Sequence, residues 1–161
     1  MNALAQEAAR ELFLLNLGVH DTRNVVRWAD EQVEKEESPS DTLIELSTMP
    51  PERIDGFIAG LSRLRDGSDI WAAYRDAMPS IYDYVVKNPE KTELIASTLY
   101  LLLAQYFVDT LPSDFQFIYR FGDAFDLARQ GIYGDLKSVG EEFTDELKHF
   151  KKTPKCQNPN P

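Results

Sequence analysis

Apolar residues recur every three or four positions along almost the whole chain, and alternation of apolar and polar residues is hard to find. This spacing matches the turn of an α-helix, whereas a half-buried strand alternates with a period of two. Glycine or proline interrupts the pattern at intervals, for example at Gly18, at Ser38-Pro39 and at Pro50-Pro51. The pattern therefore predicts an all-α fold, a compact orthogonal or irregular bundle of about seven or eight helices.

Individual stretches make this prediction more specific. Leu94 to Val108 is apolar nearly all round, which predicts one central helix surrounded by the others. Pro79 lies within the helical stripe from Ile70 to Val85, so we expect that helix to be kinked or split into two. Two shorter helices are expected to bury their apolar positions, which are Leu43, Ile44 and Leu46 in the first and Ile54, Phe57, Ile58, Leu61 and Leu64 in the second.

The length of 161 residues is typical of a single domain and is enough to bury a core without a disulfide or a structural metal. We predict one helical domain over residues 1–152. Residues 153–161 hold three of the nine prolines and almost no apolar side chain, so we expect a flexible tail. The single cysteine, Cys156, lies in this segment and excludes an intrachain disulfide.

Charge narrows the choice of partners. The chain holds 17 basic and 27 acidic residues, for a formal net charge of −10. An acidic protein repels phosphate backbones and anionic lipids, so general binding to nucleic acid or to a membrane surface is not expected. The N-terminus lacks the basic region of a secretory signal, and Leu94 to Val108 is too short to cross a bilayer. A cytoplasmic location is the resulting expectation.

A search for catalytic, cofactor-binding and metal-binding motifs finds none that is complete. The eight glycines form no phosphate-binding loop, and there is no Gly-x-Ser-x-Gly sequence. Glu146 and His149 have the spacing of half a carboxylate di-iron motif, but no second pair accompanies them, so a solvated surface is expected there. We therefore predict no catalytic residue, no cofactor and no metal site.

An acidic run is the first candidate for function. Six carboxylates and only one base, Lys35, fall within twelve residues, and those near the end of the expected helix oppose its macrodipole. A solvated helix end is one interpretation, and a docking surface for a basic partner is the other. The candidate partner-binding residues are Asp30, Glu31, Glu34, Glu36, Glu37 and Asp41.

Aromatic residues supply the second candidate, because the segment from Phe115 to Gln130 is rich in them. Arg120 and Asp123 are three residues apart and are expected either to pair on the surface or to line a polar cleft. The candidate pocket residues are Tyr119, Arg120, Asp123, Phe125 and Tyr133. Trp28 and Trp71 lie on or beside apolar stripes, so each is expected to anchor the core or, if exposed, an interface.

The segments Val25 to Val33, Glu37 to Asp41 and Leu43 to Ser47 together resemble a pattern found in small helical bacterial proteins. Most of those proteins are uncharacterised, and some are similar to immunity proteins of toxin systems. The resemblance covers residues 25–65 and implies no catalytic residue.

Together these features predict a non-enzymatic domain that binds another protein, in its sharper form an acidic immunity-type protein that neutralises a basic partner such as a toxin. Two alternatives stay open at this point, a small-molecule-binding sensor with an aromatic pocket and an enzyme with dispersed carboxylates. The sequence indicates no oligomeric state.

Overall fold

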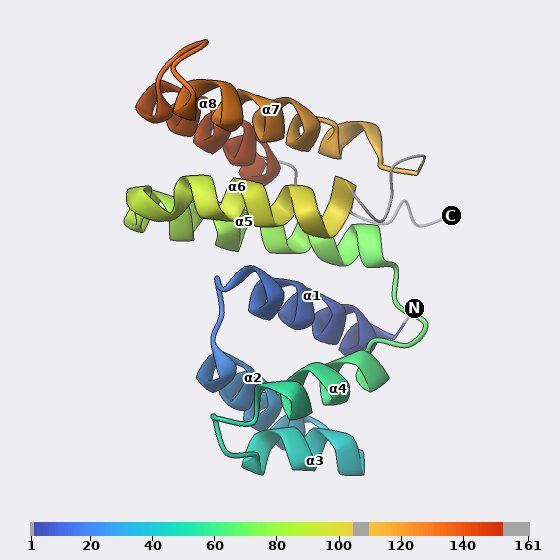
Figure 1. The fold of residues 1–161 in the computed structure, drawn as a ribbon. Coiled ribbons are helices and arrows are strands. Elements are labelled where there is room, and N and C mark those ends of the chain that lie inside the picture. The colour runs from blue at the N-terminus through green and yellow to red at the C-terminus, as the bar shows by residue number, and fades with distance from the viewer. Residues whose placement is uncertain (1, 105–109, 153–161) are drawn as a thin grey trace, which may run out of the picture. The chain divides into compact units, whose positions relative to one another are not determined.

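The computed structural model describes residues 2–104 and 110–152, and within these ranges it contains eight α-helices and no β-strand. The predicted all-α fold class is therefore confirmed (Figure 1). The α-helices are α1 (Ala3–Leu17), α2 (Thr22–Lys35), α3 (Asp41–Thr48), α4 (Ile54–Leu64), α5 (Ile70–Lys87), α6 (Thr92–Leu99), α7 (Phe117–Arg129) and α8 (Leu136–His149). Short 3₁₀ turns cover Pro89–Lys91, Ser113–Phe115 and Phe150–Lys152, and a π-helical turn covers Tyr100–Ala104.

The chain divides into two compact units, unit 1 (Met1–Ala77) and unit 2 (Met78–Pro161), and the division falls within α5. Each unit has buried hydrophobic residues of its own, and each is described separately below. The single domain predicted for residues 1–152 stays a prediction. The tail predicted at 153–161 lies outside the described residues.

Local signals set the helix ends in unit 1. The amide of Leu4 donates to the side chain of Asn2 at the start of α1, and Gly18 ends that helix in the left-handed region with φ of 73°. Asp21 caps α2, and its side chain accepts from Asn24 while Asn24 accepts from the Asp21 amide. Such caps pair backbone groups that a helix end would otherwise leave unsatisfied, so they fix the boundaries that the sequence predicts.

The core of unit 1 forms where α2, α3 and α4 pack together and α1 packs on α4. Gly60 permits this approach, because a Cβ atom there would lie 2.7 Å from Cδ2 of Leu46. Two predicted core positions are wrong: Ile44 and Ile54 are exposed, because each lies on the outer flank of its helix. The main buried residues are Ala8, Leu12, Val25, Trp28, Ala29, Leu43, Leu46, Met49, Phe57 and Leu61.

Pro79 does not split the helix that contains it, since α5 is one helix of 18 residues. Proline removes one backbone donor and crowds the preceding turn. The helix nevertheless continues through Pro79. Burial of Ala77 and Ile81 on either side of it and the remaining helical hydrogen bonds stabilise the helix against this cost. Of the two alternatives expected at Pro79, a kink or a split, the split is therefore wrong.

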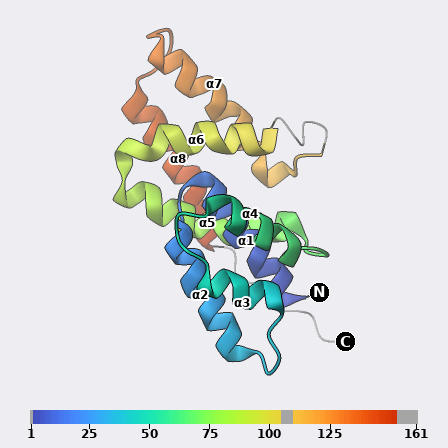
Figure 2. The same ribbon diagram turned by 60° about the horizontal axis from the view of Figure 1, so that its bottom comes forward.

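Phenylalanine rings fill the core of unit 2, in which α6, α7 and α8 pack against one another (Figure 2). Phe121 lies against Phe143 with ring centroids 5.3 Å apart and nearly perpendicular planes, and Phe125 contacts both rings. Edge-to-face contacts of this kind add to the free energy gained from burial. The aromatic-rich segment of the sequence thus supplies much of the core of unit 2.

The position predicted for α6 needs a correction. Leu99 and Leu103 are fully buried, as expected of a central helix, but Leu94 and Leu101 are 58% and 50% exposed. The helix is therefore not enclosed on all sides. Its apolar sequence covers more of its circumference than its neighbours do, and residues 105–108 of the predicted stretch lie outside the described residues.

Candidate functional site

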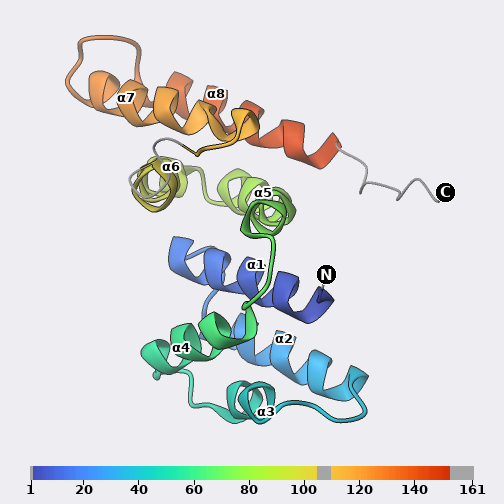
Figure 3. The ribbon, with the colours of Figure 1, turned by 90° about the vertical axis from the view of Figure 1, so that its right-hand side faces the viewer.

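The acidic segment, residues 30–41, lies at one end of unit 1. It comprises the last turns of α2, the connection to α3 and the first residue of α3, as Figure 3 shows. The inner face of α2 buries Trp28, Ala29 and Gln32, so the helical period turns Asp30, Glu31 and Glu34 outward. Five of the six carboxylates are exposed, and the sixth, that of Glu36, is partly buried.

None of these six carboxylates forms an ion pair with any residue in the part of the chain that the structure describes. Asp41 lies in the first turn of α3, where the helix macrodipole favours a negative charge. Glu31 and Glu34 lie in the last turns of α2, where the macrodipole opposes it. The six predicted residues thus lie together at one end of unit 1 without an ion pair among the described residues, and of them the macrodipole favours Asp41 and opposes Glu31 and Glu34.

A second acidic group, which the sequence analysis did not single out, is buried in unit 1. Glu11 on α1 is 2% exposed, and its carboxylate accepts a hydrogen bond of 2.7 Å from Nη1 of Arg10. The other carboxylate oxygen lies 2.7 Å from Nδ1 of His20, in the connection to α2. The three groups tie α1 to the segment that follows it, so their role in the fold is structural.

Aromatic and polar side chains surround the start of α5 in unit 1. Tyr74 stacks on Phe13 with ring centroids 4.0 Å apart and meets Trp71 edge to face. Burial raises the pKa of the Tyr74 phenol, and this effect exceeds the lowering by nearby Arg65. Trp28 belongs to the core, and its Nε1 donates to Oε2 of Glu7 at 3.0 Å.

The five candidate pocket residues have different surroundings. Phe125 is buried in the core, whereas Tyr133 is 75% exposed in the α7–α8 connection. Tyr119 meets the ring of Tyr100 edge to face. Arg120 does not pair with Asp123, which is exposed, but donates from Nη2 to Oε1 of Glu146 on α8 at 2.6 Å. The Arg120 guanidinium also lies over the Phe121 ring.

A different hollow is present in unit 2. This groove, of about 860 Å³, runs between the end of α5, the start of α6 and α8 from Leu136 to Asp145. Phe125 is the one predicted pocket residue that lines it. Its apolar lining comes from Val85, Val86, Pro89, Phe125 and Leu136, and its charged lining from Glu90, Glu93, Lys137, Glu141 and Asp145.

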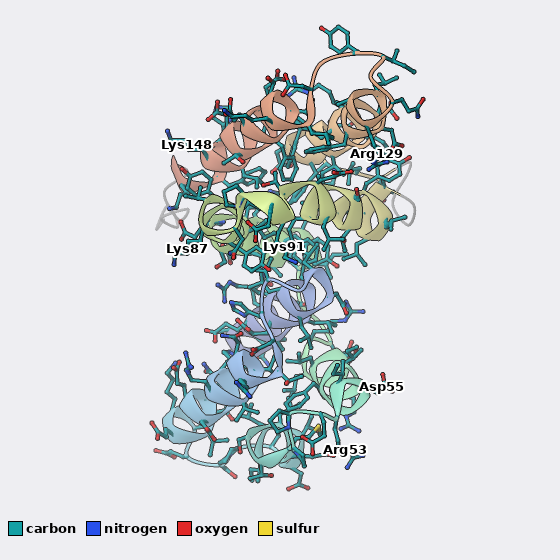
Figure 4. The ribbon with its side chains drawn as sticks, turned by 60° about the vertical axis from the view of Figure 1, so that its left-hand side comes forward. Arg53, Asp55, Lys87, Lys91, Arg129 and Lys148 are labelled. Carbon is teal, nitrogen blue, oxygen red and sulfur yellow. The ribbon has the colours of Figure 1, made fainter. Side chains whose placement is uncertain are left out.

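Charged groups hold the end of unit 2 at which the groove lies. Arg129 at the end of α7 bonds both Asp126 and Glu93, and these bonds raise the pKa of its guanidinium. Asp135 caps α8, and the bonds that its carboxylate accepts from the amide and hydroxyl of Ser138 lower the pKa of that carboxyl. Figure 4 shows Arg129 at the end of α7, and Lys87 and Lys91 at the α5–α6 connection.

Across residues 2–104 and 110–152 no three histidine, cysteine, aspartate or glutamate side chains gather as a metal ion would require. Glu146, half of the motif considered for iron, bonds Arg120 and lies 3.4 Å from His149. Within the same ranges no helix has both the length and the apolar character to cross a bilayer.

Comparison of the chain with protein-family models, with curated proteins and with solved structures finds no match. The resemblance of residues 25–65 to small helical bacterial proteins therefore stays a prediction, and the function rests on the residues themselves.

Proposed function

We propose that this chain is a non-enzymatic protein-binding module, which docks through its acidic segment onto a basic surface of a partner protein. One observation carries the proposal: the six carboxylates of residues 30–41 share a surface and have no ion pair within the described chain. Repulsion within a cluster of like charges raises the free energy of the unbound protein, and binding of a cationic partner reduces this repulsion.

Electrostatics accounts for the rate and the specificity of such an association more than for its affinity. Complementary potentials speed the encounter of the two proteins, and apolar or aromatic anchors supply most of the binding energy. Ile44, on the outer flank of α3 and 43% exposed, is a candidate anchor on the helix that the acidic segment enters. The proposed surface thus combines the carboxylates of the acidic segment with the aliphatic side chain of Ile44.

In its narrower form, the proposal is that the chain acts as an immunity-type protein, which masks a basic toxin in the cytoplasm. The resemblance of residues 25–65 and the net charge of −10 support this form. A cluster of buried acids would favour the enzyme alternative. Glu11 is the one buried carboxylate among the described residues, and two basic groups already occupy it, so no observation favours that alternative.

The experiment compares three forms of the full chain as bait in affinity capture followed by quantitative mass spectrometry. The first is the wild type, and the second carries Glu31, Glu34, Glu36 and Glu37 changed to Lys. The third is a matched control with the same change in net charge on exposed acids elsewhere, namely Glu52, Asp66, Asp123 and Glu142 changed to Lys.

A basic protein that wild type and control retain equally, and that the acidic-segment variant loses, is the expected result. If both variants retain the same proteins as the wild type, the acidic segment is a solvated helix end. If both lose them equally, the overall charge rather than this surface governs binding.

A further inference from the structure

The α5–α6 and α7–α8 connections of unit 2 lie at the same end of that unit (Figure 1). The bond from Arg129 to Glu93 ties the end of α7 to the start of α6, so the helix ends that these two connections join are held together. Five of the nine large apolar side chains that are exposed among the described residues belong to the helix ends and the loop at this site. They are Val86, Leu127, Ile132, Tyr133 and Leu136.

The α7–α8 loop presents two of these side chains to solvent. Gly131 and Gly134 flank it in the left-handed region, with φ of 67° and 69°. The amide of Ile132 donates to the carbonyl of Leu127 at 3.0 Å, which fixes the loop on the end of α7. Ile132 and Tyr133 are thereby held 65% and 75% exposed, next to each other in the chain, and an interaction surface is one use of exposed apolar side chains that cluster.

The groove described above begins beside this loop. Val86 and Leu136 line it and remain 50% and 42% exposed, so apolar surface in the groove itself is in contact with water. Its charged lining is mainly acidic. Arg129 engages Glu93, and Lys137 lies 4.0 Å from Glu141, but Glu90 and Asp145 have no ion pair among the described residues. Lys87 and Lys91 adjoin Glu90 without lining the groove (Figure 4).

We propose that this groove and loop form a docking site for a basic amphipathic helix of a partner protein. The apolar face of such a helix would cover Val86 and Leu136, while Ile132 and Tyr133 would close over its side. Lysine or arginine on its flanks would meet Glu90 and Asp145, so the charges identify a cationic rather than an acidic segment.

This site is separate from the acidic segment on which the proposed function rests. It lies in unit 2 and uses no residue of the acidic segment, so each proposal can be tested without the other. A partner that engages both sites would gain avidity, but neither site requires the other.

The test uses the full chain labelled with ¹⁵N and two synthetic peptides. Both peptides have about 15 residues, near the length at which an isolated helix persists in water, and carry leucine at helical spacing. One has lysine at the flanking positions, and the other has glutamate there. We expect the lysine peptide to shift the amide signals of the groove and loop, and to bind about tenfold or more tightly than the glutamate peptide.

Variants locate the binding. Val86→Ser together with Leu136→Ser should weaken the lysine peptide about tenfold, whereas Leu101→Ser, an equally exposed leucine outside the groove, should not. Glu90→Gln with Asp145→Asn should reduce both the affinity and its dependence on salt. Reversal of charge in the acidic segment should leave peptide binding unchanged, which separates this site from the proposed function. Circular dichroism of each variant checks that the fold is intact.

Four results would overturn the proposal. They are absence of peptide binding, equal affinity for the two peptides, shifted signals that lie away from the groove, and equal effects of the groove and Leu101 variants. Sedimentation of the free protein adds a fifth: a dimer that Val86→Ser abolishes would assign this face to a second copy of the chain.

Discussion

Glu11 shows how a single charged residue can belong to the core. Its carboxylate is almost inaccessible to water, and both oxygens have basic partners at 2.7 Å. Burial of an acid is tolerated where hydrogen bonds and opposite charge replace its hydration. The pairing with His20 joins residues nine positions apart across a helix end, which no local sequence pattern encodes.

Glu11→Gln should therefore destabilise the protein. The amide keeps the shape of the side chain but removes the charge that Arg10 and His20 face, and we expect a loss of about 1–3 kcal/mol in the free energy of unfolding. Urea denaturation followed by circular dichroism measures it. Glu31→Gln, an exposed acid without an ion pair in the described chain, is the control and should change stability little.

Tyr74 predicts the response of stability to alkaline pH. Because burial raises the pKa of its phenol in the folded chain, the ionised form is favoured in the unfolded chain. Its contribution to stability is then complete below the usual tyrosine pKa of about 10 and is lost as pH rises through the higher folded value. The phenol titrates at about pH 8 to pH 11. Over this range the denaturation midpoint of Tyr74→Phe should fall less steeply than that of the wild type. Parallel curves for the two proteins would contradict the assignment.

At the scale of helices, two glycines within helices differ in how closely a neighbouring helix approaches them. Gly60 on α4 makes room for Leu46 on α3, and a Cβ atom there would lie 2.7 Å from the leucine methyl group. Gly140 on α8 has no such neighbour, because the nearest atom to a Cβ there is 3.7 Å away, on Thr92. The same residue type in a helix therefore serves close packing at one site and not at the other.

Alanine at the two positions should have opposite effects. Gly60→Ala should cost about 1–3 kcal/mol, since overpacking outweighs the gain in helix propensity. Gly140→Ala should stabilise the protein by about 0.5–1 kcal/mol, because only the propensity changes. Thermal melts of the two variants decide the matter. Stabilisation by both substitutions would show that α3 and α4 do not pack as closely as described.

Helix ends and inner faces were predictable, because both depend on neighbours in the sequence. Asp21 and Gly18 act through backbone groups within a few residues, and apolar spacing fixes which side of a helix is buried. The exposure of Leu94 depends instead on how far other helices extend around α6, so the sequence overstated its burial. The partner of Arg120 lies 26 residues away on α8, which explains why Asp123 was a wrong alternative.

The two candidate sites also differ in how far the sequence predicts them. The acidic segment is contiguous, so its residues could be gathered from the sequence alone. The groove draws on residues from four helices and the α5–α6 connection, and Val86 and Leu136 have no feature in the sequence that marks them as neighbours.

At the scale of the whole molecule, two units share one continuous helix, α5. Both tryptophans, Trp28 and Trp71, lie in unit 1, whereas helices throughout the chain contribute to circular dichroism at 222 nm. If the chain is the predicted single domain, tryptophan fluorescence and circular dichroism should change together in urea, as two-state unfolding demands. Separate midpoints would contradict it and would identify units 1 and 2 as domains.

If the acidic segment is the docking surface, the rate of association with the partner should depend on salt and on the charges of this segment. The measurement uses the captured partner immobilised on a surface-plasmon-resonance chip, with the wild type, the acidic-segment variant and the charge-matched control as analytes. We expect the wild type and the control to associate rapidly at low ionic strength and their association rates to fall markedly as salt rises.

The variant with Glu31, Glu34, Glu36 and Glu37 changed to Lys should associate about tenfold or more slowly at low salt, with a much flatter salt dependence. Association of this variant at the wild-type rate, with the wild-type response to salt, would contradict the claim that the acidic segment is the docking surface.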